Sequence, residues 1–214
     1  MLTVHHLRGS QSERIVRLCE ELGLGYELKC YDRNKTDMLA PPEYKALHPM
    51  GIAPVITDGD LMLGESGAIV EYILATYGPG GLARGPADPD FAHYLYWLHF
   101  ANGTLQPIMG RNMMLHRLAV AAEHPMAGAM RARLALVLSQ VEARCAQAPY
   151  LAGAYLSAAD VMSVFSLTTM RSFCPLEPAP YPQIRAYLQH RIGVRDAYRR
   201  AMQKGDPEMA PMLG

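Results

Sequence analysis

A short segment rich in glycine and proline divides this chain of 214 residues into two parts with different patterns. The segment spans residues 78–87 and reads GPGGLARGPA, which neither a helix nor a strand accommodates. Before it, stretches in which apolar residues have the spacing of a strand alternate with stretches in which they have the spacing of a helix. After it, every stretch with a regular apolar pattern has the spacing of a helix. The sequence therefore predicts an α/β domain over residues 1–78, a linker over residues 79–87 and an all-helical domain over residues 88–214.

The first part predicts the element order β-α-β-α-β-β-α. Strands are expected at residues 2–6, 26–31, 54–57 and 61–63, and helices at residues 12–23, 41–47 and 65–77. The pair Asp58-Gly59 between the last two strands is a strong signal for a tight hairpin. A βαβ unit followed by a hairpin and a helix is typical of the thioredoxin-like fold.

The second part predicts helices at residues 88–117, 127–148, 181–190 and 194–204, with a further helix that begins at Ser157. Pro107 lies inside the first of these and is expected to kink it, because proline removes an intrahelical hydrogen bond. Ser157 and Asp160 have the spacing of a capping box, in which a serine hydroxyl and an acidic side chain exchange hydrogen bonds with the backbone.

Composition and charge exclude several classes of function. Lys plus Arg equals Asp plus Glu at 20 each, so no overall basic charge favours nucleic acid. The net charge is −4 over residues 1–77 and +4 over the remaining residues. The chain has no apolar run of about 18 residues and no secretory signal at its start, so a cytoplasmic protein is expected. Four cysteines without a CxxC pair argue against a disulfide framework and against a metal site.

Four motifs recur in an order and spacing that resemble one family. They are LRGSQSER at residues 7–14, HPMGIAPVI at residues 48–56, GESGAI at residues 64–69, and the Ser157–Asp160 box. Together they resemble the cytosolic glutathione transferases, in particular bacterial-type members with a serine in the active-site loop. The resemblance implies a thioredoxin-like domain that binds glutathione, a helical second domain, a homodimer and no metal. It also implies conjugation of the glutathione thiolate to a hydrophobic electrophile, or reduction of a peroxide.

Such chemistry needs a thiolate, whereas a free thiol has a pKa of about 8.5. A helix N-terminus and a hydroxyl donor both stabilise a sulfur anion. The resemblance implies this donor in the loop before the first helix, where Ser10 and Ser12 are the candidates. Ser12 also has the position of a helix N-cap. His6 lies at the end of the first strand, and packing is the better interpretation of its role.

The resemblance implies the glutathione contacts. The backbone of Ala53, before a cis Pro54, would pair with the cysteinyl peptide. Glu65 and Ser66, at a helix start, would bind the ammonium and carboxylate of the γ-glutamyl end. Ile52 replaces a polar residue common in the family, so either glutathione binds more weakly or the glycyl carboxylate depends on Lys35 or His48. Arg14 and Arg17 lie nearby, and on a surface helix such cations are more often solvated.

The second substrate is expected to bind between the domains, beside Leu7, Met109 and Arg111. The wider set of candidates on the first long helix, most of them expected to be core residues, is Tyr94, Trp97, His99, Phe100, Asn102, Met113 and Met114. Two other functions stay open at this point. One is glutathione-dependent disulfide reduction without an enzyme cysteine, and the other is a ligand-binding protein that has the fold and no activity.

Overall fold

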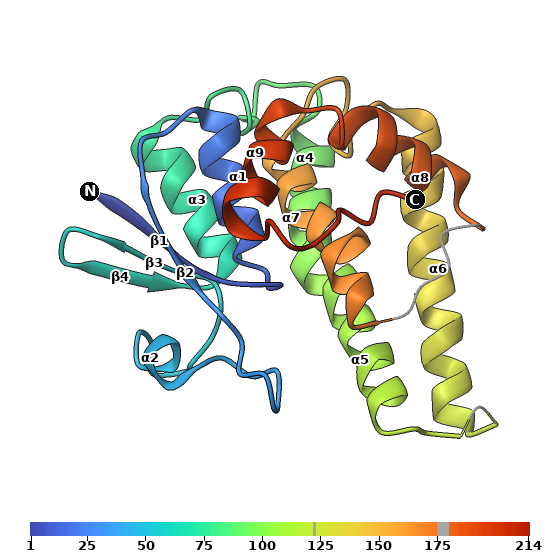
Figure 1. Ribbon diagram of the computed structural model, residues 1–214. Coiled ribbons are helices and arrows are strands. Elements are labelled where there is room, and N and C mark those ends of the chain that lie inside the picture. Colours follow the sequence, from blue (N-terminus) through green and yellow to red (C-terminus); the bar gives the residue numbers. More distant parts are fainter. Residues whose placement is uncertain (122, 175–179) are drawn as a thin grey trace. The chain divides into compact units, whose positions relative to one another are not determined.

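A computed structural model describes residues 1–121, 123–174 and 180–214 (Figure 1). The contacts divide the chain into two compact units. The first comprises residues 1–82 together with 195–211, and the second comprises residues 83–194 together with 212–214. The C-terminal helix therefore belongs to the first unit, whereas the sequence pattern grouped it with the helical domain.

The first unit is built on a four-stranded sheet in the order β2-β1-β3-β4. The strands are β1 (Leu2–Leu7), β2 (Glu27–Tyr31), β3 (Val55–Asp58) and β4 (Leu61–Gly64). Strand β1 runs parallel to β2 and antiparallel to β3, and β3 and β4 form a hairpin. With α1 (Glu13–Leu22), α2 (Pro42–Lys45) and α3 (Ser66–Tyr77), the element order matches the prediction and confirms the thioredoxin-like fold.

The helices of this unit cover both faces of the sheet. Helices α1 and α3 lie on one side and α2 on the other (Figure 1). All six residues of β1 are buried, which fits the central strand of a sheet covered on both faces. On the α2 side, Leu7 and Tyr44 form a small apolar cluster, against which Tyr31 and Ala53 pack. This cluster places the end of β1 close to the segment that precedes β3.

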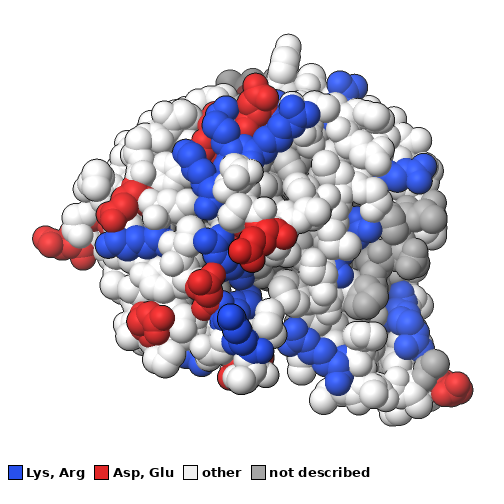
Figure 2. Space-filling model, in the orientation of Figure 1, with Lys and Arg blue, Asp and Glu red and all other residues white. Residues whose placement is uncertain are grey.

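Helix α9 (Asp196–Gly205) is held against α1 by charged groups. The Glu20 carboxylate accepts hydrogen bonds from Arg200, at 2.9 Å, and from Lys204. These charges gather in a mixed patch over α1 and α9 in Figure 2. Burial alone would raise the pKa of Glu20, but the bonds from Lys204, Arg200 and Tyr26 outweigh it and lower the pKa.

Two further interactions hold α9 and the residue before it against α1, an ion pair and a buried guanidinium. Glu21 binds Arg195 at 2.7 Å. The guanidinium of Arg17 is fully buried and lies 5.3 Å from the ring centroid of Tyr198 on α9. Arg17 was expected in solvent, and that expectation was wrong because α9 covers this face of α1. The helical period of α9 shows that it is a helix but not which unit it joins, since its partners lie about 180 residues earlier in the chain.

The second unit is helical. Its elements are α4 (Phe91–Phe100), η1 (Ala101–Leu105), α5 (Gln106–Arg117), α6 (Pro125–Gln147), α7 (Ala158–Leu167), η2 (Thr169–Ser172), α8 (Pro182–Tyr187) and η3 (Leu188–Ile192). The single helix expected at residues 88–117 is thus two α-helices joined by η1, a π-helical turn. Pro107 lies in the first turn of α5, where its missing N–H is tolerated.

The predicted capping box is present at the start of α7, with reciprocal bonds between Ser157 and Asp160. Asp160 is fully buried and also accepts hydrogen bonds from the backbone of Leu151 and the hydroxyl of Tyr187. It thereby connects the segment before α7 to α8. Among the described residues, no helix is long and apolar enough to cross a bilayer.

Candidate functional site

The loop between β1 and α1 brings Ser10 and Ser12 together. Their Oγ atoms are 2.8 Å apart, and the Ser12 backbone N–H donates to the Ser10 Oγ at 3.2 Å. Both side chains are buried. Ser12 directly precedes α1, but its hydroxyl makes no capping bond to the helix. It turns back to β1 instead, where the Leu7 N–H donates to it at 3.1 Å, so the Ser12 side chain does not act as the N-cap of α1.

His6 lies behind this pair, fully buried on β1. Its Nδ1 is 2.8 Å from the Ser12 Oγ, and its Nε2 is 3.0 Å from the Oδ2 of Asp206, just beyond α9. The other Asp206 oxygen accepts the Gly9 N–H at 2.8 Å. Burial opposes the charge on Asp206, but bonds from His6 and Gly9 and the nearby charge of Arg8 lower its pKa. The role expected for His6, packing at a strand end, omits these polar contacts.

The Ala53–Pro54 peptide bond is cis, as the resemblance implied. Pro54 is buried directly before β3, and Ala53 is half-buried. Ala53 packs against the cluster that contains Leu7, the last residue of β1, which directly precedes the serine loop (residues 8–12). The backbone at Ala53 and the serine loop therefore lie near each other within the first unit.

The start of α3 supplies a second group of polar contacts. Glu65 is exposed and has φ of 67°, a left-handed conformation that is costly for a residue with a side chain. Ser66 is buried at the first position of α3, and its Oγ accepts a hydrogen bond of 3.1 Å from Arg14. The expectation that Arg14 is solvated was wrong, because α3 covers it. Burial lowers the pKa of Arg14 to about 9, so it stays charged at neutral pH.

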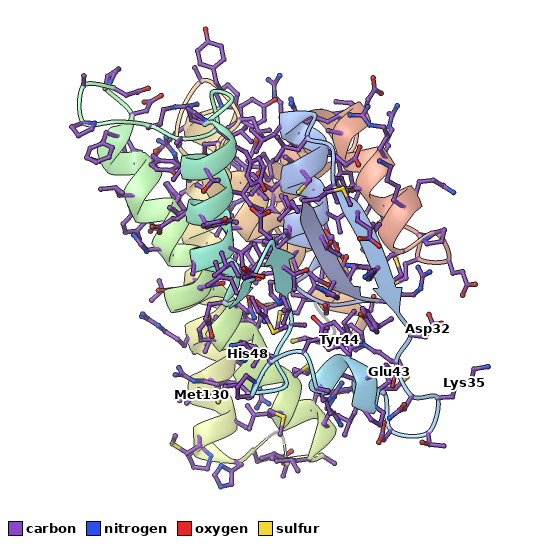
Figure 3. All side chains as sticks on the ribbon, turned by 90° about the vertical axis from the view of Figure 1, so that its left-hand side faces the viewer. Asp32, Lys35, Glu43, Tyr44, His48 and Met130 are labelled. Carbon is purple, nitrogen blue, oxygen red and sulfur yellow. The ribbon has the colours of Figure 1, made fainter. Side chains whose placement is uncertain are left out.

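His48 and Ile52 lie together beside Gly64. A Cβ built on Gly64 would come within 3.0 Å of the Ile52 side chain and 3.2 Å of the His48 Nε2. The Met50 N–H donates to the His48 Nδ1 at 3.2 Å, so in the neutral ring the proton is on Nε2. Figure 3 shows Lys35 on the far side of α2 from His48. The structure therefore groups His48, but not Lys35, with the start of α3.

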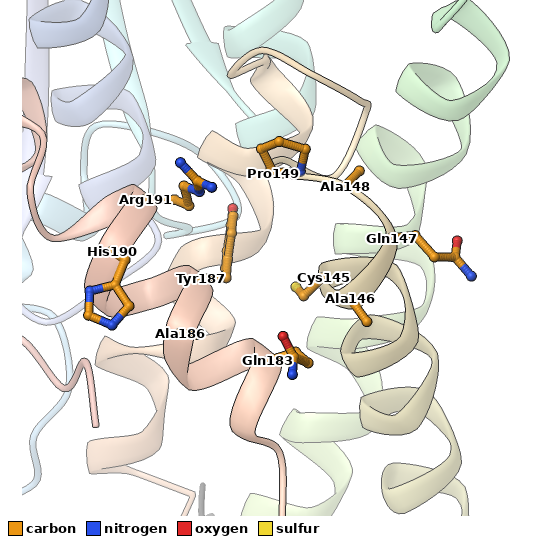
Figure 4. A pocket seen from close by; sticks show the side chains of 10 residues that line it. All are labelled: Cys145, Ala146, Gln147, Ala148, Pro149, Gln183, Ala186, Tyr187, His190 and Arg191. Atoms are coloured by element: carbon orange, nitrogen blue, oxygen red, sulfur yellow. The ribbon is translucent and has the colours of Figure 1, made fainter.

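The candidates for the second substrate differ in exposure. Leu7 and Met109 are buried, and Arg111 is exposed. Of the wider set, Tyr94, Trp97 and Phe100 are buried, as expected of core residues. His99 and Met114 are exposed and Asn102 and Met113 are half-buried, so the expectation that most of the set is core was wrong. A pocket of about 360 Å³ lies in the second unit at the end of α6 and along α8 (Figure 4). Its walls include Cys145, Tyr187 and Arg191, and none of the predicted substrate contacts.

The four cysteines are free thiols. Burial raises the pKa of Cys19 and of Cys145 to about 12, and it also raises the pKa of Cys30 and of Cys174. Because the thiolate is the reactive form, these side chains are poor nucleophiles at neutral pH. Any thiol chemistry at this site would use the thiol of a substrate.

The sequence prediction omits Asp206 and places Arg14 in solvent, whereas the structure gives both residues buried partners. Asp206 lies 200 residues from His6, and no local motif surrounds it. The burial of Arg14 follows from α3, and its pairing with Ser66 spans 52 residues. Contacts between buried polar residues so far apart in the sequence produce no periodic pattern of apolar residues and no motif. Only the folded structure therefore identifies them.

Comparisons with known proteins identify the family. Two family models match, described as glutathione S-transferase, N-terminal domain, at residues 1–75, and glutathione S-transferase, C-terminal domain, at residues 98–193. Glutathione S-transferase 3 of Schizosaccharomyces pombe is 39% identical over 54% of this chain and 47% of its own length. Glutathione S-transferase 3 of Zea mays is 29% identical over 88% of this chain and 87% of its own.

A solved structure covers the whole chain. The crystal structure of a glutathione S-transferase from Actinobacillus pleuropneumoniae is 32% identical, with a TM-score of 0.85. The alignment covers 100% of this chain and 99% of that one. The chain shares its fold with a known member over its whole length, and it belongs to the glutathione S-transferase family.

Proposed function

We propose that this glutathione transferase ionises the thiol of glutathione at Ser10. The observation that carries the proposal is the position of the Ser10 hydroxyl, which is held by the Ser12 amide directly before the N-terminus of α1. A hydroxyl and a helix N-terminus both stabilise a sulfur anion. Ser12 supports Ser10 from within the loop.

The rest of glutathione would bind to the neighbouring groups of the first unit. The cysteinyl backbone would pair with Ala53, as in strand addition beside the cis Pro54. The γ-glutamyl carboxylate would accept hydrogen bonds from Ser66 and the first amides of α3, with the Arg14 charge behind them. Glu65 would pair with the γ-glutamyl ammonium. The His48 Nε2–H, beside Ile52, would donate to the glycyl carboxylate.

The thiolate would then attack a hydrophobic electrophile, forming a carbon–sulfur bond as the leaving group departs. Alternatively, it would attack a peroxide oxygen, which breaks the O–O bond and releases an alcohol, and a second glutathione would reduce the resulting sulfenic acid to a disulfide and water. We propose Leu7, Met109 and Arg111 as contacts of this second substrate, a homodimer as the assembly, and the cytoplasm as the location. Neither alternative, disulfide reduction or a ligand-binding protein without activity, is favoured by the family relatives.

Glutathione binding tests this proposal. Replacing Ser66 with alanine removes a hydrogen bond to a charged group, so the Kd for glutathione is expected to rise about tenfold in calorimetry. Ser139→Ala, the same change on an exposed face of α6, is the matched control and should bind like the wild type. No measurable binding of glutathione to the wild type would contradict the proposed function.

A further inference from the structure

A continuous chain of hydrogen bonds connects Asp206 to Ser10. It runs from the Asp206 Oδ2 to the His6 Nε2 at 3.0 Å, and from the His6 Nδ1 to the Ser12 Oγ at 2.8 Å. It ends with the 2.8 Å contact between the hydroxyls of Ser12 and Ser10. The exposed fractions of Asp206, His6, Ser12 and Ser10 are 2%, 0%, 0% and 6%, so water does not compete along the chain.

The partners fix the direction of each bond. Asp206 is an ionised acceptor, so the Nε2 of His6 carries a proton and donates to it. In the neutral ring Nδ1 is then an acceptor. The Ser12 hydroxyl donates to Nδ1 at 2.8 Å in preference to the Leu7 carbonyl at 3.2 Å.

The remaining protons follow by elimination. The Ser12 Oγ already donates its one proton to His6 and accepts the Leu7 N–H, so its second lone pair accepts the Ser10 hydroxyl. The Ser10 Oγ in turn accepts the Ser12 N–H, which leaves one lone pair on this oxygen. Within this chain of hydrogen bonds, the Ser10 oxygen can therefore accept a proton from a ligand.

We propose that these residues form a proton relay that carries the thiol proton of glutathione to His6. The proposal rests on the proposed function, in which that thiol binds at Ser10. The S–H bond breaks as Ser10 takes its proton, Ser10 passes its own proton to Ser12, and Ser12 passes its proton to Nδ1 of His6. The products are a thiolate and an imidazolium paired with Asp206, and Ser10 now donates to the sulfur.

The other charged and titratable groups near His6 have partners of their own or stay neutral. Arg8 donates to the carbonyl of Gly205 and forms an ion pair with the exposed Asp32. Arg33 binds the carbonyls of Arg8 and Gly9 and so holds the loop. Cys30 pairs with His6 across β1 and β2, and burial raises its pKa, so it remains a neutral thiol at neutral pH. Asp206 is the carboxylate that balances an imidazolium here, and it acts as a positioning residue.

A proton count on the wild type tests the relay directly. Glutathione binding is measured by calorimetry in buffers of different ionisation enthalpy, and the ultraviolet absorbance of the thiolate is recorded in parallel. The relay predicts a thiolate band at neutral pH with about zero protons released per site, because His6 keeps the thiol proton. A thiolate band with release of about one proton per site would overturn the relay while leaving the proposed function intact.

Asp206→Asn provides the second arm. Its oxygen can still accept the Gly9 N–H, but its amide would donate to Nε2 of His6 and move the ring proton to Nδ1, which blocks the relay. We expect kcat/KM at neutral pH to fall at least about tenfold, with the Kd for glutathione unchanged. Activity should recover above a pH of about 8.5, where the thiol ionises without help.

Asp32→Asn is the matched control. It removes one negative charge, as Asp206→Asn does, from the carboxylate that pairs with Arg8, but among the described residues Asp32 makes no contact with the hydrogen-bonded residues of the relay. It should keep the wild-type pH profile. A profile of Asp206→Asn that is lowered equally at every pH would show a merely structural role and would overturn the relay. If the wild type bound no glutathione, in contrast, the proposed function itself would be contradicted.

Discussion

Replacing Ser10 with alanine is expected to lower kcat/KM for conjugation of glutathione to a generic aryl halide about a hundredfold. The change removes the hydroxyl that donates to the sulfur anion, and it also removes the first step of the relay. The neighbouring Ser12 amide loses its acceptor, but the backbone bonds that begin α1 remain. The effect should therefore appear in the reaction and in the pKa of the bound thiol more than in the stability of the fold.

Two further variants make this result interpretable. Ser10→Thr retains a hydroxyl and should recover part of the lost activity. Ser139→Ala, on the exposed face of α6, should leave the rate unchanged. Unchanged rates in Ser10→Ala would show that another group contacts the thiolate.

Replacing Asp160 with alanine is expected to lower the free energy of unfolding by about 3–5 kcal/mol. The buried carboxylate accepts the N–H groups of Leu151 and Ser157, both at 2.9 Å, and the hydroxyls of Ser157 and Tyr187, at 3.0 and 2.8 Å. Alanine would leave these buried donors without their acceptor. Such a loss is a large fraction of the stability of a typical domain.

Urea denaturation followed by circular dichroism measures this effect. Asp196→Ala is the matched control, because Asp196 is an exposed acid in the first turn of α9 and its loss should cost about 0.5 kcal/mol. Asp160→Asn should fall between the two, since one oxygen still accepts. An Asp160→Ala variant as stable as the control would contradict the role of Asp160 as the acceptor that these groups share.

Local periodicity and turn chemistry predict most of the fold. The alternation of strands and helices before residue 78 gives the thioredoxin-like order, and the spacing of Ser157 and Asp160 gives the capping box. The assignment of α9 to the first unit could not be predicted, because it depends on ion pairs such as Glu21–Arg195. The π-helical turn before Pro107 was also missed, since a proline shows where a hydrogen bond is lost and not how the chain adapts.

Short motifs indicate candidate site residues, but they do not indicate the buried residues that contact them. Ser10 and Ser66 follow from motifs in which they lie beside a helix start. Arg14 looked like a surface cation, because the α1 pattern alone does not show that α3 covers it. Asp206 has no motif, and the role proposed for it rests on its 3.0 Å contact with His6, which is 200 residues away in the sequence.

A crystal structure of the wild-type enzyme with glutathione would show where the substrate thiol binds. We expect the cysteinyl sulfur within hydrogen-bond distance of the Ser10 Oγ, the cysteinyl backbone paired with Ala53, and the γ-glutamyl carboxylate on Ser66. A glutathione whose sulfur lies away from Ser10, or whose γ-glutamyl end binds away from α3, would contradict this expectation.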